Sequence, residues 1–254
     1  RGGWVMLGEI RDIASGMQSV LRLLLPPTCL VCDRPVTTEA GLCGACWRET
    51  PFIQGLVCDK CGLPLPGEDT GRPEYCDDCL TMARPWARGR AAILYKDSAR
   101  RMVLGLKHGD RIDLVGPAAG WMRRAGAPLL TGDPLVAPVP LHWLRLLRRR
   151  YNQSALLGQA LARGAGLDWC PDLLVRPRPT PPQDHGDRDA RFRNVAGAIR
   201  AHPARAGRLS GRQVLLVDDV MTSGATFAAA TEACLEAGAA SVSVLALARV
   251  ERDA

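Results

Sequence analysis

Paired cysteines in the N-terminal part of the chain could bind metal ions. Eight of the ten cysteines form four pairs in which two residues separate the partners. This spacing lets both thiolates of a tight turn face one ion, and a second such turn completes a tetrahedral site. The pattern predicts two structural Zn²⁺ sites within residues 26–82, each with four protein ligands. The expected ligands are Cys29, Cys32, Cys43, Cys46, Cys58, Cys61, Cys76 and Cys79.

The assignment of these pairs to the two sites is open. Sequential sites, with the first two pairs on one ion and the last two on the other, need only short loops and are favoured. Interleaved sites would satisfy the same counts. Disulfides, an iron–sulfur cluster, a redox dithiol, or one zinc beside a degraded second site are the remaining alternatives. Disulfides are rare in cytoplasmic proteins, and four evenly arranged pairs favour closed zinc sites over an exposed redox pair.

Two adjacent carboxylates, Asp218 and Asp219, follow the apolar residues 214–217. Four apolar residues in a row are typical of a buried parallel strand, and open α/β sheets bind ligands at the carboxyl ends of their strands. A helix is expected to begin near Ala225, and its free backbone N–H groups would form a cradle for an anion. The candidate phosphate-binding segment comprises Val220, Met221, Thr222, Ser223, Gly224, Ala225 and Thr226.

Carboxylates beside a phosphate cradle fit a sugar phosphate better than a phosphate alone. Asp218 and Asp219 could accept hydrogen bonds from ribose hydroxyls while Mg²⁺ bridges hydroxyl and pyrophosphate oxygens of the ligand. A P-loop ATPase is one alternative, but the chain has no G-x-x-x-x-G-K-[ST] motif. A receiver-type acidic pocket is another, but it would not require the Thr-Ser-Gly-Ala-Thr sequence that follows the carboxylates.

Residues 214–226 resemble the 5-phosphoribosyl-1-pyrophosphate signature of type I phosphoribosyltransferases. Together with the four cysteine pairs, the chain resembles the ComF family of competence-associated phosphoribosyltransferase-like proteins, in which a double zinc ribbon precedes the transferase-like domain. The resemblance covers about residues 26–250 and extends to Lys107 and to residues 151–153. One departure is Arg150, where the family often has glycine.

The resemblance implies roles for further parts of the chain. Asp218 and Asp219 would be the catalytic residues, and Mg²⁺ would accompany 5-phosphoribosyl-1-pyrophosphate. Residues 176–190 would form a mobile loop that closes over the ligand, and a loop near residue 140 would bind pyrophosphate. The implied contacts are Pro140, Leu141 and His142 in the pyrophosphate loop, and Arg178, Thr180, Gln183 and Arg191 in or after the mobile loop.

Alternating apolar runs and helical patterns begin at residue 88 and predict an α/β sheet. The resemblance specifies a type I phosphoribosyltransferase fold, with a mainly parallel sheet flanked by helices. The expected organisation is an amphipathic helix over 1–25, the double zinc ribbon over 26–82 and the phosphoribosyltransferase-type domain over 88–250. Strands are expected near 90–95, 135–139, 172–175, 213–217 and 241–248, and helices over 98–107, 112–125, 153–164 and 225–238.

The chain carries a formal net charge of +7, and all but three of its 33 basic residues are arginine. This excess fits a polyanion partner, and it fits equally the codon usage of a GC-rich genome. No apolar run approaches the roughly 18–20 residues of a membrane helix, so no membrane insertion is expected. Charged residues interrupt the N-terminal apolar stretch, which does not fit a signal peptide and favours the cytoplasm.

Three classes of function agree with these features. The first is a phosphoribosyltransferase, and the second is a sensor that binds 5-phosphoribosyl-1-pyrophosphate or a nucleotide without turnover. The third is an interaction protein in DNA uptake and natural transformation, the role that the resemblance implies. Its partners would be single-stranded DNA or a DNA-uptake helicase. The fold alone does not decide among these classes.

Overall fold

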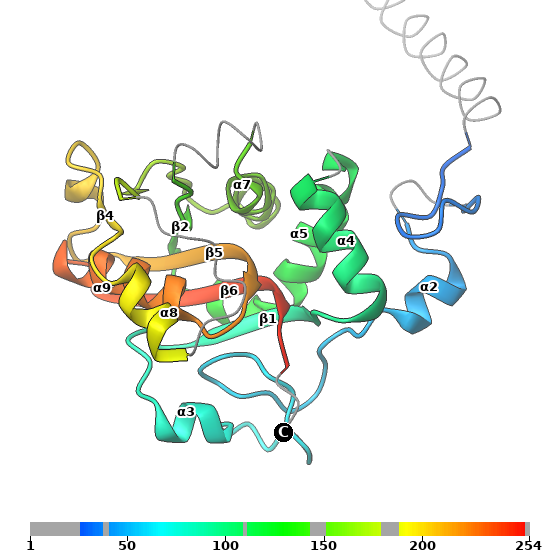
Figure 1. Ribbon diagram of the computed structural model, residues 1–254, viewed down its shortest axis with the longest axis horizontal. Coiled ribbons are helices and arrows are strands. Elements are labelled where there is room, and N and C mark those ends of the chain that lie inside the picture. Colours follow the sequence, from blue (N-terminus) through cyan, green and yellow to red (C-terminus); the bar gives the residue numbers. More distant parts are fainter. Residues whose placement is uncertain (1–25, 38–40, 109–110, 143–150, 179–187, 252–254) are drawn as a thin grey trace, which may run out of the picture. The chain divides into compact units, whose positions relative to one another are not determined.

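The computed structural model divides the chain into two compact units, residues 1–49 and 50–254, and each is described by itself (Figure 1). The helix predicted over residues 1–25 lies outside the described residues. The structure describes residues 26–37, 41–108, 111–142, 151–178 and 188–251, with the backbone alone at 188–191.

The first unit holds the first two cysteine pairs on compact local structure. A bridge between Thr28 and Pro35 closes a turn, in which the Cys29 amide donates to the Arg34 carbonyl over 2.7 Å. The second pair lies at the start of helix α2 (Gly44–Glu49). Both pairs therefore lie on short, tightly folded segments, which can hold their sulfur atoms close together.

A four-stranded parallel sheet forms the centre of the second unit. Its strand order is β1-β6-β5-β2, and β5 pairs with both β2 and β6. The four strands predicted for this sheet are confirmed, but β5 continues beyond the predicted end at residue 217 because it stays paired with β6 as far as Met221 and Arg249. The strands are β1 (Gly89–Leu94), β2 (Leu135–Pro138), β5 (Gln213–Met221) and β6 (Ser241–Arg249).

Helices cover both faces of this sheet. The side chain of Leu216 packs in the same core as Phe227 of helix α9, whereas Val217 on the opposite face lies close to Gly158 of α7. Figure 1 shows α5 and α7 on one side of the sheet and α3 on the other. The long helices are α4 (Asp97–His108), α5 (Val115–Ala125), α7 (Gln153–Ala165) and α9 (Ala225–Glu236).

The four helices predicted within residues 98–238 are confirmed, with one difference. Residues 112–114 form a separate 3₁₀ turn before α5, so the helix predicted over 112–125 begins later than expected. Pro117 lies in the first turn of α5, where a missing backbone donor is tolerated. The 3₁₀ turns are η1 (Ile112–Leu114), η2 (Ala127–Leu129) and η3 (Ala206–Arg208).

A small antiparallel sheet and one helix depart further from the prediction. The strand expected over 172–175 is limited to β3 (Leu174–Val175), which pairs with the unpredicted β4 (Arg200–Ala201). The predicted mobile loop 176–190 ends early, because helix α8 (Arg188–Val195) begins inside it. The polar sequence of α8 lacks a continuous apolar stripe, which explains why this helix was not predicted.

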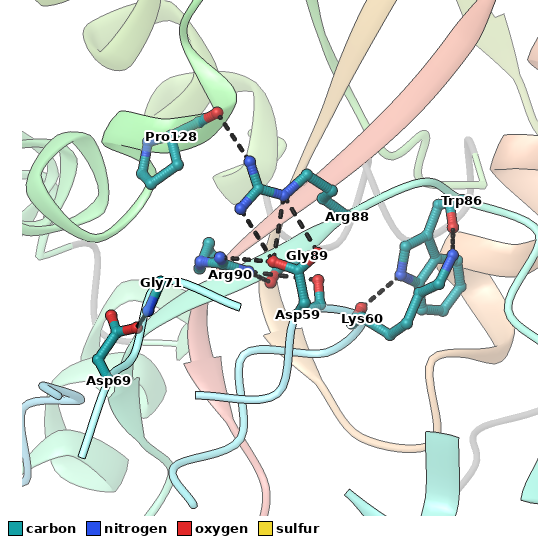
Figure 2. A network of polar contacts seen from close by, with 9 residues as sticks. All are labelled: Asp59, Lys60, Asp69, Gly71, Trp86, Arg88, Gly89, Arg90 and Pro128. Atoms are coloured by element: carbon teal, nitrogen blue, oxygen red, sulfur yellow. Dashed lines mark hydrogen bonds and ion pairs between the residues drawn. The ribbon is translucent and has the colours of Figure 1, made fainter. Parts of the chain in front are cut away.

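The second ribbon belongs to the same unit as the sheet. Helix α3 (Asp77–Thr81) carries its last cysteine, and Cys58 and Cys61 are fully buried in the core that also contains Trp86. Figure 2 shows Asp59, from the turn between two cysteines, accepting hydrogen bonds from arginines at the start of β1. The ribbon therefore shares the hydrophobic core of the sheet.

Candidate functional site

The two carboxylates lie near the carboxyl end of β5, where a parallel sheet exposes its binding edge. Ser154, in the first turn of α7, donates its hydroxyl to Asp218 Oδ1 over 2.7 Å. The same oxygen accepts the backbone N–H of Asp219 over 2.8 Å. These two bonds fix the Asp218 side chain.

Asp219 is paired with Lys107, the next-to-last residue of α4. The Lys107 Nζ lies 3.2 Å from Asp219 Oδ1, and both side chains are largely shielded from solvent. Burial and the negative charge of Asp219 raise the pKa of Asp218 to about 7. The site therefore holds two carboxylates and one ammonium group, an arrangement that can accept hydrogen bonds from hydroxyl groups.

The segment after the carboxylates has the predicted loop-to-helix geometry. Gly224 adopts a φ of 82° and is the N-cap of α9, which begins at Ala225 as expected. Ser223 is buried, and its Oγ accepts from the Ala225 N–H over 3.4 Å. Thr222 is exposed. The N-terminus of α9 thus combines backbone donors with an exposed hydroxyl, which suits an anion.

The predicted pyrophosphate loop follows the neighbouring strand. Pro138 is the register partner of Val217, so the chain after β2 starts beside the carboxylates. Asn152 caps α7 through Ser154 N–H and donates its amide to the Val139 carbonyl over 3.1 Å. His142 is buried. Pro140, Leu141 and His142 therefore begin at the same sheet edge as Asp218 and Asp219.

The predicted mobile-loop residues are only partly described. Arg178 is exposed and donates to the Ala196 carbonyl over 2.6 Å, beyond the end of α8. Thr180 and Gln183 lie outside the described residues. Arg191 lies on α8, and its side chain is outside the described part of the structure.

The first cysteine cluster has the donors of a zinc site. One sulfur from each of Cys29, Cys32, Cys43 and Cys46 lies within 4.8 Å of the others. The Cys43 N–H also donates to the Cys29 sulfur over 3.3 Å. Four thiolates converging in this way fit tetrahedral Zn²⁺.

The second cysteine cluster groups Cys58, Cys61, Cys76 and Cys79 within the same 4.8 Å limit. The sequential arrangement is therefore confirmed, and the interleaved one is wrong. Hydrogen bonds from Cys58 and Cys79 lower the pKa of the Cys61 thiol, and the positive charge of Arg249 acts in the same direction. Like the first cluster, this set of four sulfur donors fits a closed structural zinc site.

The cations beside the second cluster were not found from the sequence. Lys60 lies between Cys58 and Cys61 in the sequence, but its Nζ donates to the Trp86 carbonyl over 2.9 Å. Arg249 lies there instead, with its Nη2 3.9 Å from Cys61 Sγ. Arg84 also interacts with the Cys79 side chain. Arg249 is far from the cysteine pairs in sequence, and Arg84 follows the last pair at a position to which the Cys-x-x-Cys spacing does not point.

Comparison with known proteins agrees with this arrangement. The model of the double zinc ribbon domain matches residues 20–80. The chain is 33% identical over 234 residues to DNA utilization protein YhgH of Salmonella typhi, covering 89% of this chain and 99% of the relative. The chain belongs to the ComF family. Another ComF relative, Competence protein F of Haemophilus influenzae, is 25% identical over 222 residues, or 82% of this chain and 90% of that protein.

Solved structures to which this ComF chain is similar include phosphoribosyltransferases. Adenine phosphoribosyltransferase from Thermoanaerobacter pseudethanolicus aligns with 55% of this chain and 82% of its own, at 17% identity and a TM-score of 0.33. The parallel sheet flanked by helices and the double zinc ribbon with two four-cysteine sites confirm the predicted fold class. Among the described residues, no helix is long and apolar enough to cross a membrane.

Proposed function

We propose that this ComF protein binds 5-phosphoribosyl-1-pyrophosphate with Mg²⁺ at the carboxyl edge of its sheet. The observation that carries the proposal is the position of Asp218 and Asp219 on β5, a few residues before the Gly224-capped start of α9. Carboxylates that can accept hydrogen bonds from ligand hydroxyls thus lie close in sequence to backbone N–H groups that can donate to a phosphate. A simple phosphate site would not require the two carboxylates.

Each part of the ligand has a candidate partner in this proposal. The N-terminus of α9 and residues 222–226 would bind the 5-phosphate, because helix N-termini attract anions. Asp218 and Asp219 would accept hydrogen bonds from the ribose hydroxyls. Residues 140–142 would bind pyrophosphate, and Mg²⁺ would be held chiefly by oxygen atoms of the ligand.

Such a complex would be suited to displacement of pyrophosphate from ribose C1 by a nitrogen nucleophile. The carbon–oxygen bond to pyrophosphate would break as the new carbon–nitrogen bond forms, and pyrophosphate would leave with the bonding electron pair. The protein would contribute positioning and charge stabilisation. Release of pyrophosphate in the presence of a nucleobase would distinguish an enzyme from a sensor.

A role in the use of DNA follows from the relatives named DNA utilization protein and Competence protein F. In this proposal the chain acts in the cytoplasm. Contact with single-stranded DNA is a second candidate, favoured by the net charge of +7 and by the exposed side chain of Tyr75 on the second ribbon. Bases stack on exposed aromatic rings, and phosphate contacts weaken steeply with salt. Absence of binding at low salt would exclude this second candidate.

Thermal unfolding with and without ligand tests the site. A ligand that binds only the folded chain raises the unfolding temperature. Phosphoribosyl pyrophosphate with Mg²⁺ is expected to stabilise the native chain, and Asp218→Asn combined with Asp219→Asn should abolish the increase. Asp172→Asn is the matched control, because Asp172 is an exposed carboxylate paired with Arg205. An equal increase in the double variant would contradict the proposed site.

A further inference from the structure

Two buried arginines lie between the second cysteine cluster and the loop that precedes α9. Arg249 is 3% exposed and Arg84 is 8% exposed. A buried guanidinium requires hydrogen-bond acceptors and negative charge nearby. The groups that surround these two arginines therefore show what each one stabilises.

Arg249, the last residue of β6, contacts both the loop and the cluster. Its Nη1 donates to the Thr222 carbonyl over 2.7 Å and to the Met221 carbonyl over 3.3 Å. Its Nη2 lies 3.9 Å from Cys61 Sγ. The planar guanidinium group of Arg249 thus contacts both the first carbonyls of the loop and a sulfur of the second site.

Arg84, which follows the last cysteine pair, makes a parallel connection. Its Nη1 donates to the Ser223 carbonyl over 2.7 Å, and its side chain interacts with Cys79. Its guanidinium carbon also lies 5.4 Å from the centre of the Trp86 ring, within the range of a cation–π contact. Carbonyls of three consecutive residues, 221–223, are therefore held by two arginines.

Trp86 completes this support beneath Gly224. A Cβ at Gly224 would lie 2.9 Å from Trp86 Cη2 and 3.2 Å from Arg84 Nη1. Figure 2 shows that Trp86 is itself fastened to the second ribbon, because its indole N–H donates to the Lys60 carbonyl and its own carbonyl accepts from Lys60 Nζ. The loop therefore rests on side chains that the ribbon holds in place.

The negative charge of the zinc-thiolate cluster explains how the metal site would act on the loop. Four thiolates on one Zn²⁺ carry a formal charge of about −2, which stabilises two buried guanidinium groups. Without the metal, the four sulfur atoms would no longer be held together, and Arg249 would lose the fixed position of its partner Cys61 Sγ. Because the two arginines hold the carbonyls of residues 221–223, the loop would change with them.

We propose that the zinc-thiolate cluster of the second ribbon sets the conformation of the phosphate loop through Arg84 and Arg249. The two arginines are positioning residues, since each acts on the loop backbone. The proposal rests on the proposed function only for the identity of the ligand. The first cysteine cluster belongs to the other compact unit and has no part in it.

The loop itself can be observed without any ligand. In the full-length ¹⁵N-labelled chain, the amide resonances of Ser223, Gly224 and Thr226 are expected to move in Cys79→Ser, which removes a ligand of the second site. The matched change in the first site, Cys32→Ser, should leave them in place. Unchanged loop resonances in Cys79→Ser, with the sheet resonances intact and one zinc lost, would overturn the proposal.

Substitution of an arginine provides a second test, in which all cysteines remain in place. This test remains available if Cys79→Ser does not fold. Arg249→Lys keeps the charge but cannot bridge the loop and sulfur with a planar fork. It should retain the zinc content and weaken phosphoribosyl pyrophosphate binding by about tenfold, as loss of a supporting partner typically does. Arg212→Lys, which alters an arginine paired with Asp168, should bind normally.

The outcomes separate this proposal from the proposed function. If the native chain fails to bind phosphoribosyl pyrophosphate, the proposed function is wrong, and the response of the loop resonances to Arg249→Lys still decides the connection. If Arg249→Lys keeps two zinc ions, native loop resonances and native affinity, the connection is wrong while the binding site stands.

Discussion

The Lys107 ammonium lies 3.2 Å from a carboxylate oxygen of Asp219, whereas the adjacent Asp218 is bonded to the Ser154 hydroxyl. The two carboxylates thus have different partners from two different helices. Lys107 partly neutralises the pair, which limits repulsion between the two negative charges in a site largely shielded from solvent. Ligand hydroxyls would have to reach carboxylates that already have partners.

Removal of the lysine should raise the pKa of Asp218. The charge of Lys107 lowers that pKa, whereas burial and Asp219 raise it to about 7. In Lys107→Met we expect an increase of about one pH unit, the lower end of the effect of a nearby charge. Carbon-detected NMR titration of the Asp218 carboxyl measures it. Lys96→Met is the control, since Lys96 pairs with Glu251 in an exposed position. An unchanged midpoint would exclude Lys107 as a determinant of the pair's charge.

The raised pKa of Asp218 predicts how stability depends on pH. The folded chain holds this proton more tightly than the unfolded chain, so stability should decrease as pH rises from about 4 to about 7. Asp218→Asn removes the effect and should stabilise the ligand-free chain at pH 8 by on the order of 1–3 kcal/mol, because one pKa unit corresponds to about 1.4 kcal/mol. The gain should shrink at pH 6. Urea unfolding at the two pH values provides the comparison, and a gain that is equal at both would contradict the assignment.

Gly224 should not tolerate a side chain. Its φ of 82° and the 2.9 Å approach of Trp86 Cη2 to an added Cβ combine backbone strain with a clash. Gly224→Ala is expected to lower the free energy of unfolding by about 1–3 kcal/mol. Gly120→Ala is the control: Gly120 lies within α5 with no atom near its added Cβ, so it should be neutral or stabilising by up to about 1 kcal/mol. Equal stability of the two variants would argue against a strained loop.

Metal content should follow the two cysteine clusters separately. The native chain is expected to carry about two zinc ions, and Cys46→Ser and Cys79→Ser should each remove one. Cys234→Ala should keep both, because Cys234 is a buried cysteine of α9 outside the clusters. Elemental analysis of gently purified protein measures these contents. A native content clearly below two would exclude two filled sites.

Local patterns were enough to predict much of the site. The cysteine pairs and the Asp218-Asp219 segment are contiguous in sequence, so their chemistry is visible without the fold. The residues that contact this segment, Lys107, Ser154 and Arg249, belong to other helices and strands. Their positions beside it depend on strand order and on helix packing. Lys107 was noted only through the family resemblance, and nothing in its neighbourhood predicted the ion pair.

The elements that were missed have a related explanation. Helix α8 has no clear apolar stripe, and β4 consists of two residues that pair only because Leu174 and Val175 lie opposite. Their existence depends on tertiary contacts more than on local preference. Long strands such as β5, whose residues 214–217 are all buried, were predictable because burial on both faces requires a continuous apolar run.

Calorimetric titration of phosphoribosyl pyrophosphate into the zinc-loaded chain, with and without Mg²⁺, tests whether the carboxyl edge of the sheet binds this ligand. We expect saturable binding that requires Mg²⁺ and is lost when Asp218 and Asp219 are both replaced by asparagine. Absence of binding by folded, zinc-loaded protein at ligand concentrations up to about 1 mM, where even an affinity of about 4 kcal/mol would be detected, would contradict it.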